Sequence, residues 1–166
     1  VMRLVEIFLC FPILLFLLFA SSLLGDSSLG LVLVMASLFW TSFARIVRGE
    51  LLSLRERDFV LVARGLGISE RRILWHHLMP LLKSQIGVTA AFCMASAIVA
   101  ESTLSFLGIG PGQAASSWGN MLRQGSDVAY LGHWHMWLFP TAAIVAVVMC
   151  CHVLADRVRS RATEQV

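Results

Sequence analysis

The sequence has few charged residues: 14% are Asp, Glu, Lys or Arg, whereas 58% are hydrophobic. A soluble globular domain carries about 25% charged residues. The mean hydropathy of +0.80 agrees with this imbalance. The composition therefore excludes an ordinary soluble domain and predicts a membrane protein. The net charge of +3 is small, which argues against nucleic-acid binding, because that function usually needs a strongly basic surface.

Several chemical signatures are also absent. The sequence contains no GxxxxGK[ST] phosphate-binding loop and no GxGxxG pattern, so we do not expect this chain to bind ATP itself. No HExxH pattern or Ser/His/Asp set stands out, so we expect no catalytic residues and no enzyme activity. The four cysteines lie in apolar runs without a CxxC pair, which is typical of small buried residues. His133 and His135 alone are a weak metal signal, and we expect no metal and no cofactor.

Long apolar runs dominate what is present. The first contains 18 residues, which span about 27 Å as a helix, close to the thickness of the hydrocarbon core. The runs predict an all-α fold, a polytopic transmembrane helical bundle. Its four predicted spans cover about residues 7–24, 29–47, 84–106 and 136–154.

Positive charge is concentrated between the second and third runs. The segment Arg45–Pro80 holds seven of the thirteen Lys and Arg residues, whereas the stretch 107–135 holds only Arg123. Lys and Arg are enriched in cytoplasmic loops of membrane proteins. We therefore predict a cytoplasmic loop at 48–80, an external loop at 107–135, and both ends of the chain in the cytoplasm.

The first part of the cytoplasmic loop has an amphipathic pattern. Ser53 followed by Glu56 matches a capping box, which predicts a helix from Leu54. Four apolar residues then recur at helical spacing and predict one apolar face. These residues are Phe59, Val62, Ala63 and Leu66.

Glycine and proline divide the second part of the loop. Gly67 is a natural left-handed helix stop, and Ser69 can cap a second helix over Glu70–Leu78. Pro80 is then expected to begin the next helix. The predicted arrangement is an amphipathic helix, a tight glycine turn and a second short helix.

One carboxylate and a glycine-rich stretch lie at the far end of the third run. Glu101 is ionisable and close to a membrane span, where such a group is costly and often marks a transport path. The alternative is that Glu101 lies at the interface or caps a turn near Ser102 and Ser105. The Gly- and Pro-rich residues 108–112 predict that the external loop has no regular helix there and packs on the membrane surface or a partner.

The segment Arg55–Pro80 resembles the EAA loop of permease subunits of bacterial ABC importers. Ala63 matches the last Ala of that motif, Gly67 matches its Gly, and 78–80 matches its closing Ile-Leu-Pro-like triplet. The stretches SLRERDFVLVARGLG, ESTLSFLGIG and SWGNML resemble the dipeptide, oligopeptide and nickel branch of these permeases. The resemblance covers nearly the whole chain, with the motifs in the same order.

The resemblance implies a permease subunit of a peptide importer in the inner membrane. It implies cytoplasmic ATPase subunits, a second permease forming a heterodimer, an external solute-binding protein and the lipid bilayer as partners. The chain would be the C-terminal part of a six-span permease whose cytoplasmic loop docks on the ATPase, with Glu101 a candidate for the substrate path. The residues expected to couple to the ATPase are Glu56, Asp58, Phe59, Val62, Ala63, Leu66, Gly67 and Pro80.

The chain departs from the family pattern at three places. Leu61 and Val62 occupy the positions of the motif's Glu and first Ala, so coupling would use other charges, such as Glu56 or Asp58. The residues QAAS at 113–116 replace prolines that many relatives have. Relatives also have two further spans before this region, so we expect a fragment, a truncated gene product or an incomplete gene model.

Two other classes of protein stay open at this point. A secondary transporter or channel would have ionisable residues at mid-membrane and broken helices in matched halves, and the apolar runs carry almost no such residues. A truncated, non-transporting membrane scaffold is the other alternative, and it gains weight if the two preceding spans do not exist.

Overall fold

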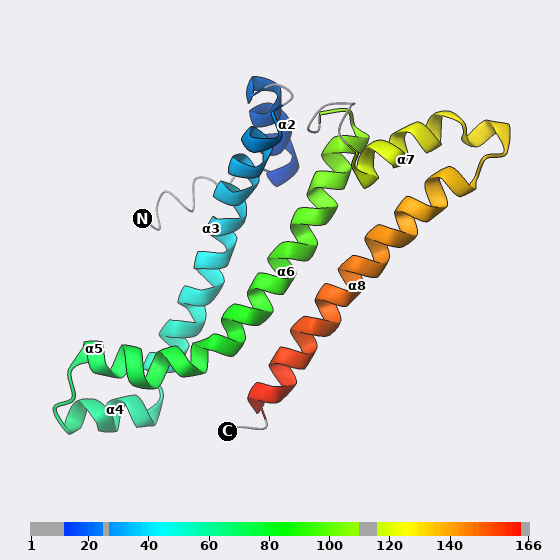
Figure 1. Ribbon diagram of the computed structural model, residues 1–166. Coiled ribbons are helices and arrows are strands. Elements are labelled where there is room, and N and C mark those ends of the chain that lie inside the picture. Colours follow the sequence, from blue (N-terminus) through cyan, green and yellow to red (C-terminus); the bar gives the residue numbers. More distant parts are fainter. Residues whose placement is uncertain (1–11, 25–26, 110–115, 164–166) are drawn as a thin grey trace.

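The protein is a row of long helices, described by a computed structural model over residues 12–24, 27–109 and 116–163. Every regular element in these ranges is helical, as the sequence predicts. Helix α6 (Met79–Phe106) lies between α3 (Ser28–Arg55) and α8 (His135–Thr163), and α2 (Ile13–Leu24) packs against the first half of α3 (Figure 1).

Three helices are long and apolar enough to cross a membrane within the described ranges. They are Ser28–Arg55, Glu70–Phe106 and His135–Ser160. They contain the predicted spans 29–47, 84–106 and 136–154. The predicted span 7–24 begins outside the described residues, and its described part is the 12-residue helix α2.

The first correction concerns the end of α3. The helix does not stop near residue 47 but continues to Arg55, with Glu56 as its C-cap. Ser53 therefore lies inside the last turn of α3 and does not begin a helix, so the predicted capping box is wrong. The next helix, α4 (Asp58–Gly65), begins four residues after the predicted start at Leu54. Leu54 is buried against Val60 and other apolar residues, which explains why the helix continues so far.

The second correction concerns Pro80, which does not begin a separate helix. Residues 70–106 form one continuous rod: α5 (Glu70–Arg72), a π-helical turn (Ile73–Leu78) and α6. A proline inside a helix lacks the N–H donor and its ring crowds the carbonyl four residues earlier. The wide π turn lies directly before Pro80, and the N–H of Met79 bonds to the carbonyl of Leu74. The chain thus passes the proline without a break.

The third correction concerns the predicted external loop, which contains a helix. Helix α7 (Trp118–Asp127) packs against the ends of both α6 and α8 (Figure 1). Gly119 allows this contact, because a Cβ there would overlap the backbone oxygen of Ser102 and lie 2.6 Å from the Cβ of Ser105. The loop therefore packs on its own helices. The glycines and proline at 110–112 lie outside the described residues.

Two hydrophobic clusters hold the helices together at opposite ends. One joins α2, α3 and α6 towards the α7 end. Its buried residues are Leu17, Leu31, Met35, Leu38, Ala100 and Leu104. The other joins the end of α3 to α4 and the start of the long rod. Its buried residues are Leu54, Val60, Ala63, Ile73, Leu78 and Leu82.

Candidate functional site

Residues 55–80 form a compact helical hairpin, which we call the coupling hairpin after the role that the family resemblance predicts for this segment. Its turn has the hydrogen bonds of a Schellman motif: the N–H of Ile68 bonds to the oxygen of Ala63 at 3.1 Å, and the N–H of Gly67 bonds to that of Arg64 at 2.9 Å. Gly67 has φ +76°, a left-handed conformation that favours glycine. The predicted glycine stop is confirmed, and Ile68 packs against the same cluster as Ala63.

Helix α4 has one face inside the hairpin and one face outside it. Val60 and Ala63 are buried in the hairpin cluster. Phe59, Val62 and Leu66 are exposed by 38%, 62% and 76%. The sequence placed Ala63 on the outer apolar face, and the structure corrects this, since Ala63 is only 6% exposed. The outer face consists of the other three predicted residues together with Leu61, which is also exposed.

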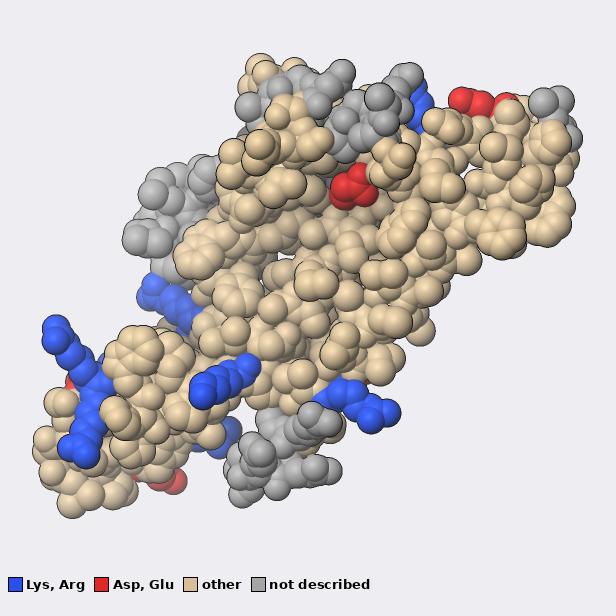
Figure 2. Space-filling view, in the orientation of Figure 1, with Lys and Arg blue, Asp and Glu red and all other residues tan. Residues whose placement is uncertain are grey.

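Charged side chains gather at the hairpin end of the molecule (Figure 2). Glu56 and Asp58, two predicted coupling residues, are exposed, and neither forms an ion pair with another described residue. Pro80, a third, is exposed just after the hairpin's π turn. The hairpin therefore exposes charged side chains to solvent, and it also exposes the apolar outer face of α4. This arrangement is typical of a helix that binds in a groove of a partner.

Glu70 takes part in both ion pairs that join described residues of the hairpin. Its carboxylate accepts hydrogen bonds from Arg64 at 2.6 Å and from Arg55 at 3.2 Å. The hydrogen bond from Arg64, more than any other interaction, holds the pKa of the Glu70 carboxyl below its usual value. Glu70 is exposed and precedes the predicted span 84–106, so it lies outside the apolar part of the rod. The sequence pattern marks Glu70 only as the first residue of the predicted second helix.

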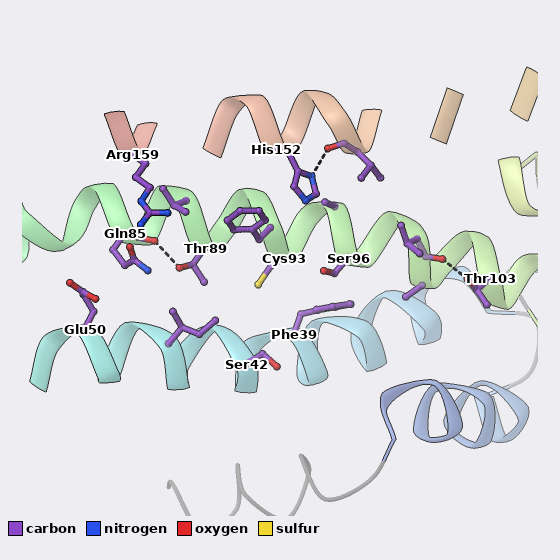
Figure 3. Close-up of a pocket in the computed structure, with 17 residues that line it drawn as sticks. Phe39, Ser42, Glu50, Gln85, Thr89, Cys93, Ser96, Thr103, His152 and Arg159 are labelled. Carbon is purple, nitrogen blue, oxygen red and sulfur yellow. Dashed lines mark hydrogen bonds between the residues drawn. The ribbon is translucent and has the colours of Figure 1, made fainter. Parts of the chain in front are cut away.

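A long groove runs along α6 between α3 and α8 (Figure 3). Its volume is about 870 Å³. Apolar side chains from more than one helix line it, with Phe39 of α3 and Val88 of α6 among them. Polar side chains from all three helices also reach the groove. They are Ser42, Glu50, Gln85, Thr89, Ser96, Thr103, His152 and Arg159.

Some of these polar groups are satisfied by their own helices. Thr89 donates to the carbonyl of Gln85 at 2.8 Å, and Thr103 donates to that of Val99 at 2.7 Å. The Nδ1 of His152 lies 2.8 Å from the carbonyl oxygen of Val148. By contrast, the side chains of Glu50 and Gln85 have no hydrogen-bond partner among the described residues. They lie near Arg159 at one end of the groove (Figure 3), which suits a surface that meets water or a polar solute.

Glu101, the predicted candidate for the substrate path, does not line this groove. Its Oε1 accepts a hydrogen bond at 2.7 Å from Ser105, which is fully buried. The neighbouring hydroxyl of Ser102 is buried and has no hydrogen-bond partner in the part of the chain that the structure describes. The sequence left open that Glu101 lies at the interface or caps a turn near Ser102 and Ser105. The structure shows a bond to the Ser105 hydroxyl and not to a backbone turn, and a role in the substrate path stays a prediction.

The remaining sequence signals contribute no further site. The rings of His133 and His135 are 5.8 Å apart, edge to face. Within the described ranges, no three His, Cys, Asp or Glu residues are grouped as metal ligands would be. Cys93, Cys150 and Cys151 are free thiols, and Cys10 lies outside the described residues.

The sequence also matches known proteins over almost its full length. Residues 1–163 match the family described as binding-protein-dependent transport system inner membrane component. The chain belongs to this family. As a member, it is a multi-pass inner membrane protein.

Relatives in this family are named as peptide permeases. A peptide permease protein of Brucella ovis is 38% identical over 159 residues, which cover 95% of this chain and 53% of the relative. A peptide transport system permease of Brucella suis is 37% identical, with coverage of 95% and 53%. The oligopeptide transport system permease protein OppC of Salmonella typhimurium is 34% identical, with coverage of 95% and 52%. The chain thus spans about half the length of these relatives.

The sequence of this family member predicts the hairpin but does not predict the groove along α6. His152 is an isolated polar residue in an apolar run, and such isolation is itself a signal of a groove-facing position, whereas Gln85 follows Lys83 and Ser84 at the start of its run and does not stand out. Glu50 and Arg159 were missed because they lie just beyond the predicted spans 29–47 and 136–154. Only the packing of α3 and α8 on α6 brings the four residues to one surface.

Proposed function

We propose that the chain is part of a permease subunit of an ATP-driven importer that takes up peptides. Family membership and relatives named as peptide permeases support this assignment. Its partners would be cytoplasmic ABC ATPase subunits, a second permease and an external solute-binding protein. The permease would supply no chemistry, and it would carry the solute by changing between two packed states.

The coupling hairpin is the part that would touch the ATPase. The observation that carries the proposal is the outer face of α4, where Phe59, Val62 and Leu66 are exposed beside charged residues. The hairpin carries five of the chain's twelve arginines, which favours the cytoplasmic side. The C-terminal end of α8 lies at the same end of the molecule (Figure 1) and would also be cytoplasmic. Helix α7 would then lie on the external side.

The groove along α6 is the part that would line the solute path. Polar groups within membrane-spanning helices are costly in lipid and usually face a water-filled cavity or another helix. Gln85 and Ser96 line the groove at different heights along α6. If solute or water filled the groove, both side chains could form hydrogen bonds with it. In the intact transporter, the second permease would close the open side of the groove.

The decisive experiment places a charge in the outer face of α4. The variant Leu66→Asp is compared with wild type after purification from native membranes in mild detergent. Burying an unpaired carboxylate in an apolar groove is strongly unfavourable, and truncating an interface hot spot costs 2 kcal/mol or more. We therefore expect the amount of co-purified ATPase to fall at least about tenfold, while the permease stays in the membrane.

Tyr130→Asp is the matched control, because Tyr130 is 90% exposed at the α7 end. This variant should retain the ATPase at the wild-type level. Equal retention by Leu66→Asp would show that α4 does not dock. A wild-type preparation that never carries an ATP-hydrolysing subunit would overturn the importer proposal itself and favour a channel or a scaffold.

A further inference from the structure

Three separate elements of the coupling hairpin meet at Glu70. Arg55 is the last residue of α3, Arg64 lies in the last turn of α4, and Glu70 is the first residue of α5. The Nε of Arg64 is 2.6 Å from one carboxylate oxygen of Glu70, and Nη2 atoms of Arg64 and Arg55 reach the other at 3.4 and 3.2 Å. The carboxylate of Glu70, on the long rod, therefore binds the residue that ends α3 and a residue in the last turn of α4.

Helix α4 has few other contacts that could fix its direction. It contains eight residues, and an isolated helix of that length is unstable in water. Only Val60 and Ala63 on α4 are buried. Apolar burial holds a short helix against its support, but it leaves rotation and sliding on that support weakly determined, because hydrophobic contact is not directional. Hydrogen-bonded ion pairs are directional, and those with Arg are the more specific in geometry.

The ion pairs themselves are exposed, which limits their contribution to stability. Exposed fractions of the side chains are 45% for Arg55, 35% for Arg64 and 59% for Glu70. Exposed pairs typically contribute little to folding. We therefore expect the ion pairs to affect the position of α4 more than the free energy of unfolding of the protein.

We propose that Glu70 is a positioning residue that fixes α4 between α3 and the long rod, and so presents the outer apolar face to the ATPase. This inference rests on the proposed function of the hairpin. Glu70 does not touch the ATPase. It acts through Arg64 and Arg55, and the face it orients consists of Phe59, Val62 and Leu66.

Charge reversal tests the proposal in the full transporter. Glu70→Arg places three arginines together, and Arg64→Glu places two carboxylates together. Each single variant should reduce co-purified ATPase about fivefold or more, because like charges replace the pairs. The double variant Arg64→Glu with Glu70→Arg restores one pair in the reverse sense. It should recover at least half of the wild-type retention, although incompletely, because Arg55 then faces an arginine.

Arg71→Glu is the matched control, since Arg71 is exposed in the same turn and forms no ion pair with a described residue. It should retain the ATPase to within about twofold of wild type, as expected for an exposed charge without a partner. The level of membrane-inserted permease should be equal in all variants. Wild-type retention in both single variants would overturn the proposal, and so would a double variant no better than the singles. Both results leave the docking of α4 intact, because Leu66→Asp tests that separately.

Discussion

The two ends of the molecule are built by different means. At the hairpin end, α4 keeps an exposed apolar face, and partly exposed ion pairs of Glu70 with Arg55 and Arg64 link it to the neighbouring helices. At the α7 end, the helices touch backbone to backbone through Gly119 and Gly125, and polar residues such as Asn120 are buried. Both ends include a helix that stops at a left-handed glycine, Gly67 in the hairpin and Gly108 after α6.

This difference indicates that the two ends of the molecule have different roles. Close contacts through glycine are rigid, because any added atom must displace backbone. We infer that the α7 end is a fixed frame that holds α6 and α8 together. The hairpin end has a buried cluster of its own, but it also presents an exposed apolar face that would need a partner. Mutations at the α7 end should therefore reduce stability first, whereas mutations in the hairpin should reduce coupling first.

The largest effect is expected for Gly119→Ala. A Cβ at this position overlaps the backbone oxygen of Ser102 and lies 2.6 Å from the Cβ of Ser105, so α7 must move away from α6. Overpacking of a close contact costs typically about 1–3 kcal/mol, and more where backbone must shift. We expect a lower unfolding temperature in detergent and less protein in the membrane, measured by thermal unfolding of the purified protein.

Gly49→Ala is the control for this prediction. Gly49 lies inside α3 with no atom within 4 Å of an added Cβ. Alanine is favoured over glycine in a helix interior by about 0.5–1 kcal/mol, so Gly49→Ala should be neutral or stabilising. If both variants unfold at the same temperature, α7 is not clamped to α6 and the rigid frame is an incorrect description of that end.

An intermediate effect is expected for Gly67→Ala, and it should appear in coupling. Gly67 has open space around it but φ +76°, and an L-residue in that conformation costs about 1–2 kcal/mol. The turn after α4 should shift, and less ATPase should co-purify, while the protein stays folded in the membrane.

Gly65→Ala is a close match to this variant, because Gly65 is two residues away and is also surrounded by open space. It differs in having helical φ, as the last residue of α4. Gly65→Ala should retain the ATPase. Equal losses in both variants would mean that the left-handed turn is not what matters, and that the ATPase contacts this part of the hairpin directly.

The sequence alone was enough to predict the features that local chemistry determines. The apolar runs predicted three of the long helices, and the left-handed stop at Gly67 followed from the freedom of glycine. Ser69 correctly marked the start of α5, although its side chain makes no capping hydrogen bond. The separation of a charged hairpin from apolar spans also came from composition.

The features that depend on tertiary contacts could not be predicted in this way. Helix α3 passes the end of its apolar run because Leu54 packs against the hairpin cluster. Gly119 and Gly125 in α7 look like helix breakers in sequence, but they are where the helix meets its neighbours. Ala63 fits the outer apolar stripe by spacing, yet the hairpin turn places it inside. The groove depends on three helices at once.

The smallest effect is expected for Glu101→Gln, which also tests whether this carboxylate belongs to the solute path. Glutamine keeps the oxygen that accepts the hydrogen bond from Ser105, so the local contact should survive. We expect the free energy of unfolding to change by about 1 kcal/mol or less, because the hydrogen bond is kept and only its acceptor changes from a charged to a neutral oxygen. Uptake of radiolabelled trialanine should stay at the wild-type level.

Ser105→Ala serves as the comparison for Glu101→Gln. Ser105 is fully buried, and removing its hydroxyl leaves the Glu101 carboxylate without its donor, which should cost more than the change of Glu101 itself. Thermal unfolding measures this order, and uptake measures the role in transport. A marked loss of uptake in Glu101→Gln at unchanged stability would return Glu101 to the solute path. The α7 end would then carry function as well as rigidity, and the contrast between the two ends would no longer hold.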